Sequence, residues 1–379
     1  MKKNMISCYA ALFVVILLAL FMQSAWAADV EINGNASVSG TLNAGSFSGS
    51  FSGSGAGLTG IPGTAISSTS ITDTQLHDNA VTSAKIANDA VTSAKIAFFS
   101  KVAIVAASGG DYINPATAMG DYPNWCGTPS ATNPCLLKIM PGVYTVSSSV
   151  VMQPYIDIEG SGENTTFIQG SIDSTSSGIV NGANNAEIRF LTITNAGGGS
   201  STVGFYNDNT SPNITNVTVT ASGGSVGNAG VSNNNSSSPV MLNVNVTAAG
   251  GGTTPNNLAV VNVTFSSPSM RHVIAIATGG SSARGIYNDS STPTLTNSTV
   301  KASGGASSNY GIYNANGAGT IRINRSTVKA TNTIASSASW IVLVSHTQLD
   351  GGLPPLGAYT ITCVGAFNTS YVGLSTTCQ

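Results

Sequence analysis

Charge is what this sequence has least of. Only 7% of its 379 residues are charged, where about a quarter is usual in soluble proteins. The chain as written has a net charge of -2, and no stretch interleaves basic with aromatic side chains. Nucleic acid is therefore not an expected partner, because phosphate backbones are bound by clustered Lys and Arg. Solubility must come from neutral polar side chains.

Groups that carry out chemistry are also scarce. The histidines His77, His272 and His346 lie in separate segments without metal-ligand spacing. No G-x-S-x-G motif and no calcium-binding nonapeptide occurs. We therefore predict no catalytic residue, no metal site and no cofactor. Asp157 and Glu159 alternate with isoleucines and should face outward. That spacing is compatible with a general acid and base, and equally with a solvated strand face.

One long apolar run exists, near the start of the chain. Lys2 and Lys3 precede it, it ends near Met22, and a small-x-small sequence ending at Ala27 follows. This order predicts a secretory signal peptide over residues 1–27, cleaved after Ala27. No later run is long enough to span a bilayer. We expect a secreted or cell-surface protein without a transmembrane segment in the mature chain, which has a net charge of about -4.

Cysteines are few, and four remain after the leader: Cys126, Cys135, Cys363 and Cys378. An even number in an exported protein predicts disulfides, because the extracellular compartment is oxidising. Three connectivities are open. We favour pairing of nearest neighbours along the chain.

The chain does contain a repeat. Six units begin at Gly178, Gly204, Gly230, Ala259, Gly285 and Gly311, with spacings of 26, 26, 29, 26 and 26 residues. Their second position is always apolar. Their fourth position is always asparagine: Asn181, Asn207, Asn233, Asn262, Asn288 and Asn314. Such a period is too short for paired-helix repeats and near the length of one turn of a parallel β-helix.

The repeat predicts how these positions point. In an extended strand the second and fourth positions share a face, so the apolar residue and the asparagine both point inward and the third position points out. A second strand follows in each unit, as in NVTVTASGG. Asparagines stacked about 4.8 Å apart can bond to one another. We predict a buried asparagine ladder over all six positions; the alternative is that they are turn residues.

The region before the repeats divides by composition. Residues 28–70 form a Gly/Ser-rich linker of low complexity. Residues 71–100 contain an echoed decapeptide, DNAVTSAKIA and NDAVTSAKIA. Its apolar residues form a thin stripe that one chain cannot bury, which predicts self-pairing. A flexible spacer is the alternative. The linker and the decapeptides resemble segments of phage tail fibres and trimeric fibre stalks, which implies a homotrimer held through residues 71–97.

A second resemblance covers residues 101–379. KIMPGVYTV, followed by YIDIEGSGENTTFIQG, resembles the first coils of right-handed parallel β-helix proteins of the pectin-lyase-like class. The resemblance implies an all-β solenoid domain, with the INPATAMGDY helix covering one core end and TITCVGAFNTSYVGLSTTC the other. The motifs of pectinesterases and polygalacturonases are absent from the sequence. No catalytic position can be carried over.

Two outward features remain as candidate glycan-binding groups. Tyr287 and Tyr313 hold the third position of adjacent units and should form a ladder of rings that stacks on sugars. Lys301, Arg322, Arg325 and Lys329 gather in the last two units, where they could attract an anionic polymer.

The sequence thus favours a non-catalytic surface β-helix that binds polysaccharide, acts in adhesion or serves as a structural fibre. The alternative is a polysaccharide-acting lyase, esterase or hydrolase of the pectin-lyase-like or tailspike type.

Overall fold

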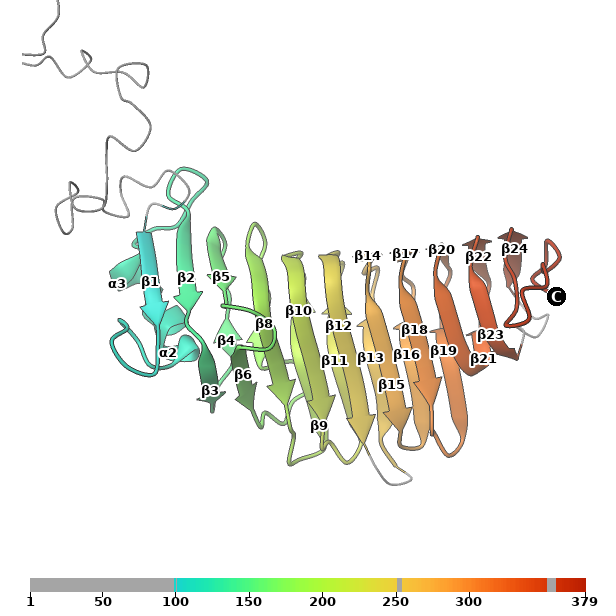
Figure 1. The fold of residues 1–379 in the computed structure, drawn as a ribbon, viewed down its shortest axis with the longest axis horizontal. Coiled ribbons are helices and arrows are strands. Elements are labelled where there is room, and N and C mark those ends of the chain that lie inside the picture. Colours follow the sequence, from blue (N-terminus) through green and yellow to red (C-terminus); the bar gives the residue numbers. More distant parts are fainter. Residues whose placement is uncertain (1–98, 100, 251–253, 353–358) are drawn as a thin grey trace, which may run out of the picture. The chain divides into compact units, whose positions relative to one another are not determined.

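The computed structural model describes residues 99, 101–250, 254–352 and 359–379 (Figure 1). The predicted signal peptide, linker and decapeptide stalk lie outside these ranges apart from residue 99, and so does the segment expected to hold a homotrimer. In the described part, no helix is long and apolar enough to cross a membrane.

The described chain is a parallel β-solenoid, as the repeat predicts. Of the described residues 55% are in strands and 4% in helices. The strands between the two ends of the solenoid pair in parallel with strands of the preceding and following coils (Figure 1). A full coil passes through three faces, here numbered in chain order. The three inward surfaces enclose one apolar core.

Face 1 begins each coil. Its strands are β1 (Lys101–Val105), β2 (Cys135–Ile139), β5 (Ile156–Glu159), the first parts of β8 (Glu187–Asn195), β10 (Asn213–Ser222) and β12 (Val240–Gly250), then β14 (Ser269–Arg271), β17 (Thr294–Thr296), β20 (Gly319–Asn324), β22 (Trp340–Ser345) and β24 (Thr360–Val364).

Face 2 follows after a sharp bend. Its strands are β3 (Gly142–Val146), β6 (Thr166–Gly170), the later parts of β8, β10 and β12, then β15 (Ile274–Gly279), β18 (Thr299–Ser303), the first part of β21 (Thr327–Ser336) and β23 (Gln348–Gly352).

Face 3 carries the repeated Gly-apolar-x-Asn frame. Its strands are β4 (Val150–Val151), β7 (Val180–Asn181), β9 (Ser201–Asp208), β11 (Gly227–Asn234), β13 (Asn256–Asn262), β16 (Ser282–Asn288), β19 (Ser308–Asn314) and the last part of β21.

Two short helices lie at the end of the core that starts with β1 (Figure 1). They are α2 (Pro115–Gly120) and α3 (Tyr122–Trp125). The Asn114 side chain caps α2 by accepting the N–H groups of Ala116 and Thr117. Ala118 and Met119 are buried in the core. The helix expected from INPATAMGDY is therefore confirmed, and it covers apolar side chains that would otherwise face water.

The first position of the repeat units from Gly204 onward is small because it packs against face 2. A Cβ added to Gly204 would come 2.4 Å from Val219 Cγ1, and one on Gly230 would come 2.3 Å from Val246 Cγ1. One unit has Ala259 instead of glycine. In the valine column of face 2, that coil carries Ala275. Relative to the other units, Ala259 adds one methyl group on face 3, and Ala275 lacks the two methyl groups of valine on face 2. The two changes offset each other, which limits the change in core volume.

The buried asparagine ladder exists over five coils. The amide Nδ2 of Asn207 donates to Asn233 Oδ1 at 2.8 Å, and the same bond recurs from Asn233 to Asn262, from Asn262 to Asn288 and from Asn288 to Asn314 at 2.8, 2.9 and 2.9 Å. All five are fully buried. The turn-residue alternative is wrong for these positions. The last amide nitrogen, on Asn314, has no hydrogen-bond partner, because Ser336 takes the next place in the column.

Asn181 is not part of this ladder, and the prediction for it is wrong. β7 aligns Val180 with Phe205 and Asn181 with Tyr206, so this coil is one residue out of the repeat frame. Gly182 lies under Asn207 instead, and a Cβ there would fall 2.0 Å from Asn207 Oδ1. The Asn181 carboxamide bonds within its own turn, to the Gly178 N–H and to Ser177.

A second polar column lies inside face 3 and was missed from the sequence. Thr202 Oγ1 donates to Asn228 Oδ1 at 2.7 Å, and Asn228 Nδ2 donates to Asn257 Oδ1 at 2.8 Å. Asn257 Nδ2 ends the chain of bonds on the Thr278 carbonyl oxygen. The signal was available, since Asn228, Asn257 and Asn309 each stand two residues before a repeat unit.

Replacing Asn262 with alanine should lower the free energy of unfolding by about 1–3 kcal/mol, because the Asn233 amide loses its acceptor and Asn288 Oδ1 loses its donor. Chemical denaturation measures the change. Asn256→Ala is the matched control: Asn256 lies on the same strand, β13, but is exposed. Equal denaturation midpoints for Asn262→Ala and the control would contradict a stabilising ladder.

Candidate functional site

The outward surface of face 3 carries a cluster of three tyrosines and an arginine. The register places Arg284 beside Tyr310 and Tyr287 beside Tyr313 on β16 and β19. The rings of Tyr287 and Tyr313 stack with centroids 6.0 Å apart and planes 17° apart. Tyr310 leans on Tyr313 at 4.9 Å. We call these four residues the tyrosine cluster.

The predicted pair of outward tyrosines therefore lies side by side, but the rings do not form an open platform. They stack on each other, and the Arg284 guanidinium carbon lies 5.6 Å from the Tyr287 centroid and 4.9 Å from the Tyr313 centroid. Such contacts are favourable because the ring face carries negative charge density. Burial raises the pKa of Tyr287, and the nearby Asp289 raises it further. The hydroxyl is therefore a neutral hydrogen-bonding group at ordinary pH.

Arg284 has no acidic partner among the described residues. Its Nε is buried without a hydrogen bond, and none of the ion pairs in the described part involves it. Arg284 and Tyr310 were missed from the sequence because both stand one residue before the start of a repeat unit, outside the frame.

A shallow apolar trough leads into the tyrosine cluster. It has a volume of about 280 Å³ and crosses β9, β11 and β13, where Val203, Ala229, Leu258 and Val261 form much of its lining. Leu258 is the register neighbour of Arg284, and Val261 that of Tyr287. Trough and cluster therefore lie on adjacent coils of face 3.

The four predicted basic residues do not share one face. Lys301 and Lys329 are register neighbours on face 2, and Lys329 Nζ pairs with Asp350 at 2.6 Å. Arg322 lies on β20 of face 1. Arg325 lies at the bend between the two faces, with a φ of 49°. The sequence placed them in neighbouring units but could not show that a bend separates them.

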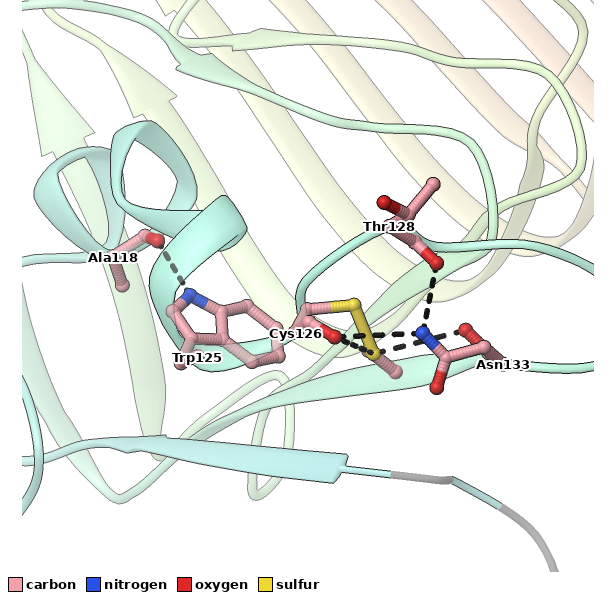
Figure 2. The surroundings of a disulfide bond; sticks show 6 residues. Ala118, Trp125, Cys126, Thr128 and Asn133 are labelled. Carbon is pink, nitrogen blue, oxygen red and sulfur yellow. Dashed lines mark hydrogen bonds between the residues drawn. A yellow bond between two sulfur atoms is a disulfide. The ribbon is translucent and has the colours of Figure 1, made fainter.

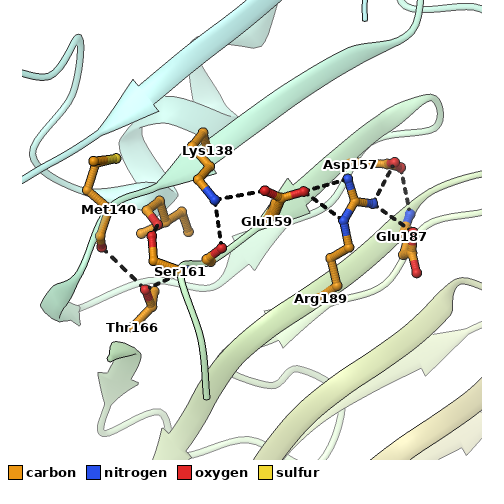
Figure 3. Close-up of polar contacts among 10 residues, drawn as sticks. Lys138, Met140, Asp157, Glu159, Ser161, Thr166, Glu187 and Arg189 are labelled. Carbon is orange, nitrogen blue, oxygen red and sulfur yellow. Dashed lines mark hydrogen bonds and ion pairs between the residues drawn. The ribbon is translucent and has the colours of Figure 1, made fainter. Parts of the chain in front are cut away.

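Asp157 and Glu159 face outward on β5, as predicted, and join an ion network with Lys138, Glu187 and Arg189 (Figure 3). Lys138 Nζ lies 2.7 Å from Glu159 Oε1. Arg189 binds Glu159 at 2.8 Å, Asp157 at 3.2 Å and Glu187 at 2.7 Å. One guanidinium thus bridges three carboxylates, each from a neighbouring position of face 1.

The network drives the two carboxyl pKa values in opposite directions. Burial raises the pKa of Asp157 above its ordinary value, although the Glu187 N–H and Arg189 bond its charged form. Burial acts on Glu159 in the same sense, but hydrogen bonds from Lys138 and Arg189 outweigh it, so the pKa of Glu159 is lowered. Desolvation by burial therefore prevails at Asp157, and the hydrogen bonds and cations prevail at Glu159.

Both predicted disulfides are confirmed. Cys126 pairs with Cys135, with Cα atoms 6.0 Å apart, and Cys363 with Cys378 at 5.5 Å. The first closes the loop after α3, where Trp125 Nε1 donates to the Ala118 carbonyl at 2.8 Å and Asn133 Nδ2 donates to the Thr128 carbonyl at 2.8 Å (Figure 2). The second ties the chain end to β24.

Comparison with known proteins gives distant structural likeness only. No protein-family model matches the sequence, and no curated protein matches it. Among solved structures, pectate lyase Pel9A has 14% identity and a TM-score of 0.46, over 71% of this chain and 74% of that one. Pectin methylesterase from carrot has 13% identity and a TM-score of 0.38, over 73% and 88%. The Dettilon tailspike protein has 12% identity and a TM-score of 0.36, over 72% and 68%.

Replacing Arg189 with methionine should destabilise the protein by about 1–3 kcal/mol at pH 7, because three half-buried carboxylates lose their shared cation. The lowered pKa of Glu159 gives stability that is present above its unfolded-state pKa and lost as pH falls through its folded-state pKa. The raised pKa of Asp157 contributes to the pH dependence of stability in the opposite direction. The cost of the substitution should therefore shrink as pH falls through the lowered folded-state pKa of Glu159.

Thermal unfolding from pH 3 to pH 8 measures this dependence. Arg271→Met is the control, because Arg271 lies three coils further along the same outward column of face 1 but is exposed. A cost for Arg189→Met that stays constant over this pH range would exclude an electrostatic origin.

Proposed function

We propose that this protein is a secreted or cell-surface solenoid that binds polysaccharide through face 3, with the tyrosine cluster and its trough as the contact surface. Glycan binding, rather than a purely structural fibre, is favoured by one observation: the coil that lines one end of an apolar trough is paired with the coil that carries Tyr287 and Arg284, an arginine without an acidic partner among the described residues. Sugars offer apolar C–H faces beside hydroxyl groups. A surface for them needs apolar area and hydrogen-bond donors in one place.

Each part of the surface has a role in this proposal. The trough lined by Val203, Leu258 and Val261 takes the apolar faces of sugar rings. Tyr287 and Tyr313 contribute ring edges and hydroxyls, since their faces are already stacked on each other. Arg284 donates to ring or hydroxyl oxygens with the N–H groups that the tyrosines leave open. Of the sequence-derived basic residues, Lys301 and Lys329 on face 2 stay candidates for secondary contacts.

Replacing Tyr287 and Tyr313 with alanine should weaken glycan binding by about tenfold or more, because each aromatic contact contributes about 0.5–1.5 kcal/mol. A panel of dextran, xylan, galactan and cello-oligosaccharides, read by array and then by calorimetry, measures it. The matched control is Tyr371→Ala, which removes a tyrosine that is 81% exposed near the C-terminus. The proposal fails if the unaltered protein binds none of the panel, or if the double variant binds as well as the control.

A polysaccharide-acting enzyme is the second candidate. Its specific support is the pair Asp157 and Glu159, whose environments move their pKa values apart, the condition under which one carboxyl donates and another accepts a proton. This candidate predicts new reducing ends, methanol or unsaturated uronide on incubation with pectins and other polysaccharides, and their loss in Asp157→Asn. Product formation that survives Asp157→Asn would rule out this pair.

A further inference from the structure

The bend between faces 1 and 2 is built from residues with left-handed backbone. From β10 onward the bend residues have φ values between 47° and 55°. They are Asn216, Asn243, His272, Asn297, Arg325 and His346. Each N–H from His272 to His346 donates to a carbonyl of the next coil. The six positions are therefore stacked in one line along the solenoid.

Asparagine and histidine are both enriched in the left-handed region, whereas a long side chain such as arginine enters it less readily. Five of the six positions follow that rule. His272 and His346 also have local partners, because Asn297 Nδ2 lies 3.3 Å from His272 Nε2 and Ser345 Oγ lies 2.7 Å from His346 Nδ1. Arg325 is the exception, and its side chain is exposed. A residue of disfavoured type in left-handed backbone is a sign of function.

More positive charge flanks this line. Arg271 precedes His272, and Arg322 lies on the outward side of β20; both are exposed. Among the described residues, none of Arg271, Arg322 and Arg325 takes part in an ion pair. We call Arg271, His272, Arg322, Arg325 and His346 the basic ridge.

Charge is also segregated along residues 101–379. Residues 101–208 hold eight acidic and three basic residues, residues 209–270 hold none of either sign, and residues 271–379 hold two acidic and six basic ones. Because the coils follow the chain order, the basic ridge lies several coils away from most of the acidic groups. Its field is screened by salt but not cancelled by neighbouring acids.

A second copy of this chain is a less suitable partner for the ridge. All eight acidic side chains of residues 101–208 already accept hydrogen bonds or ion pairs from their own chain, as Asp173 does from the Ser201 N–H and Glu163 from Thr218. They would have to break these bonds to meet the ridge.

We propose that the basic ridge is a binding site for a linear anionic polysaccharide that runs along the solenoid axis. Cations repeated at coil spacings of about 4.8 Å or its multiples can meet the sulfate or carboxylate groups of successive sugars. The site lies on the bend between faces 1 and 2, not on face 3, so it does not rest on the proposed function of the tyrosine cluster.

The test replaces each arginine with the residue that the preceding coil has in the same column: Arg271→Leu, Arg322→Thr and Arg325→Asn. The bend change is compatible with left-handed backbone, so folding should be kept, and thermal unfolding checks it. Binding of the full chain to dextran sulfate and to polygalacturonate is measured between 50 and 300 mM salt, a range of roughly the kind over which polyanion contacts weaken steeply. Neutral dextran is the uncharged reference.

The triple variant should bind the anionic polymers at least about tenfold more weakly and with a shallower salt dependence. With fewer protein cations in contact, binding releases fewer counterions from the polymer. The matched control is a second triple variant that combines Ser108→Asp, Asn164→Asp and Asn184→Asp. It changes the net charge by the same amount as the arginine substitutions do, but at exposed positions of the first coils. It should keep most of the binding. A stronger response to dextran sulfate or to polygalacturonate identifies the anionic group.

Four results would overturn the proposal. The triple variant could bind the anionic polymers as tightly as the unaltered chain, or the control could lose as much binding as the triple variant. Duplex DNA could be bound more tightly than either anionic polysaccharide. Self-association in light scattering that the triple variant abolishes, without any polymer binding, would assign the ridge to a second copy. Loss of glycan binding in the tyrosine variants would leave the ridge unaffected.

Discussion

The buried amide ladder constrains the register of face 3. A carboxamide inside an apolar core must have partners, because an unsatisfied amide costs about 1–3 kcal/mol. From Asn207 to Asn288 each amide nitrogen donates to the amide oxygen of the next coil, and only the nitrogen of Asn314, the last member, lacks a partner. A shift of one residue would turn the amides outward and bring the third position into the core. The ladder therefore favours one alignment of every coil against the next.

The outward surface follows from that alignment. Leu258 and Arg284 are 26 residues apart in sequence, as are Val261 and Tyr287, yet the register makes each pair neighbours. The trough and the tyrosine cluster lie next to each other for this reason. The same regularity stacks the left-handed bends, so basic residues from several coils come to lie in one line. Candidate binding surfaces on such a solenoid are columns, whose members are one period apart.

Much of this could be predicted from the repeat, and the failures have physical causes. The ladder, the covering helix and both disulfides follow from periodicity, turn composition and cysteine spacing. Asn181 was misplaced because β7 and β9 are related by 25 residues instead of 26, and a single irregular coil leaves no mark in a short sequence. Arg284 and Tyr310 were overlooked because they precede the frame. Asn228 and Asn257 were overlooked for the same reason, although their spacing was visible.

The sequence by itself determined the coil length and the inward apolar and asparagine positions of five coils, because these depend on residues one period apart. It left three cysteine connectivities open, and the structure decided for the nearest-neighbour pairing. Only the tertiary structure decided which outward side chains meet. It showed that the tyrosine rings stack on each other and on Arg284, that Arg189 bridges Asp157 and Glu159, and that a bend separates Lys301 and Lys329 from Arg322. These contacts depend on the angle at which the chain turns between faces and on rotamers, and neither is written in the period of the repeat.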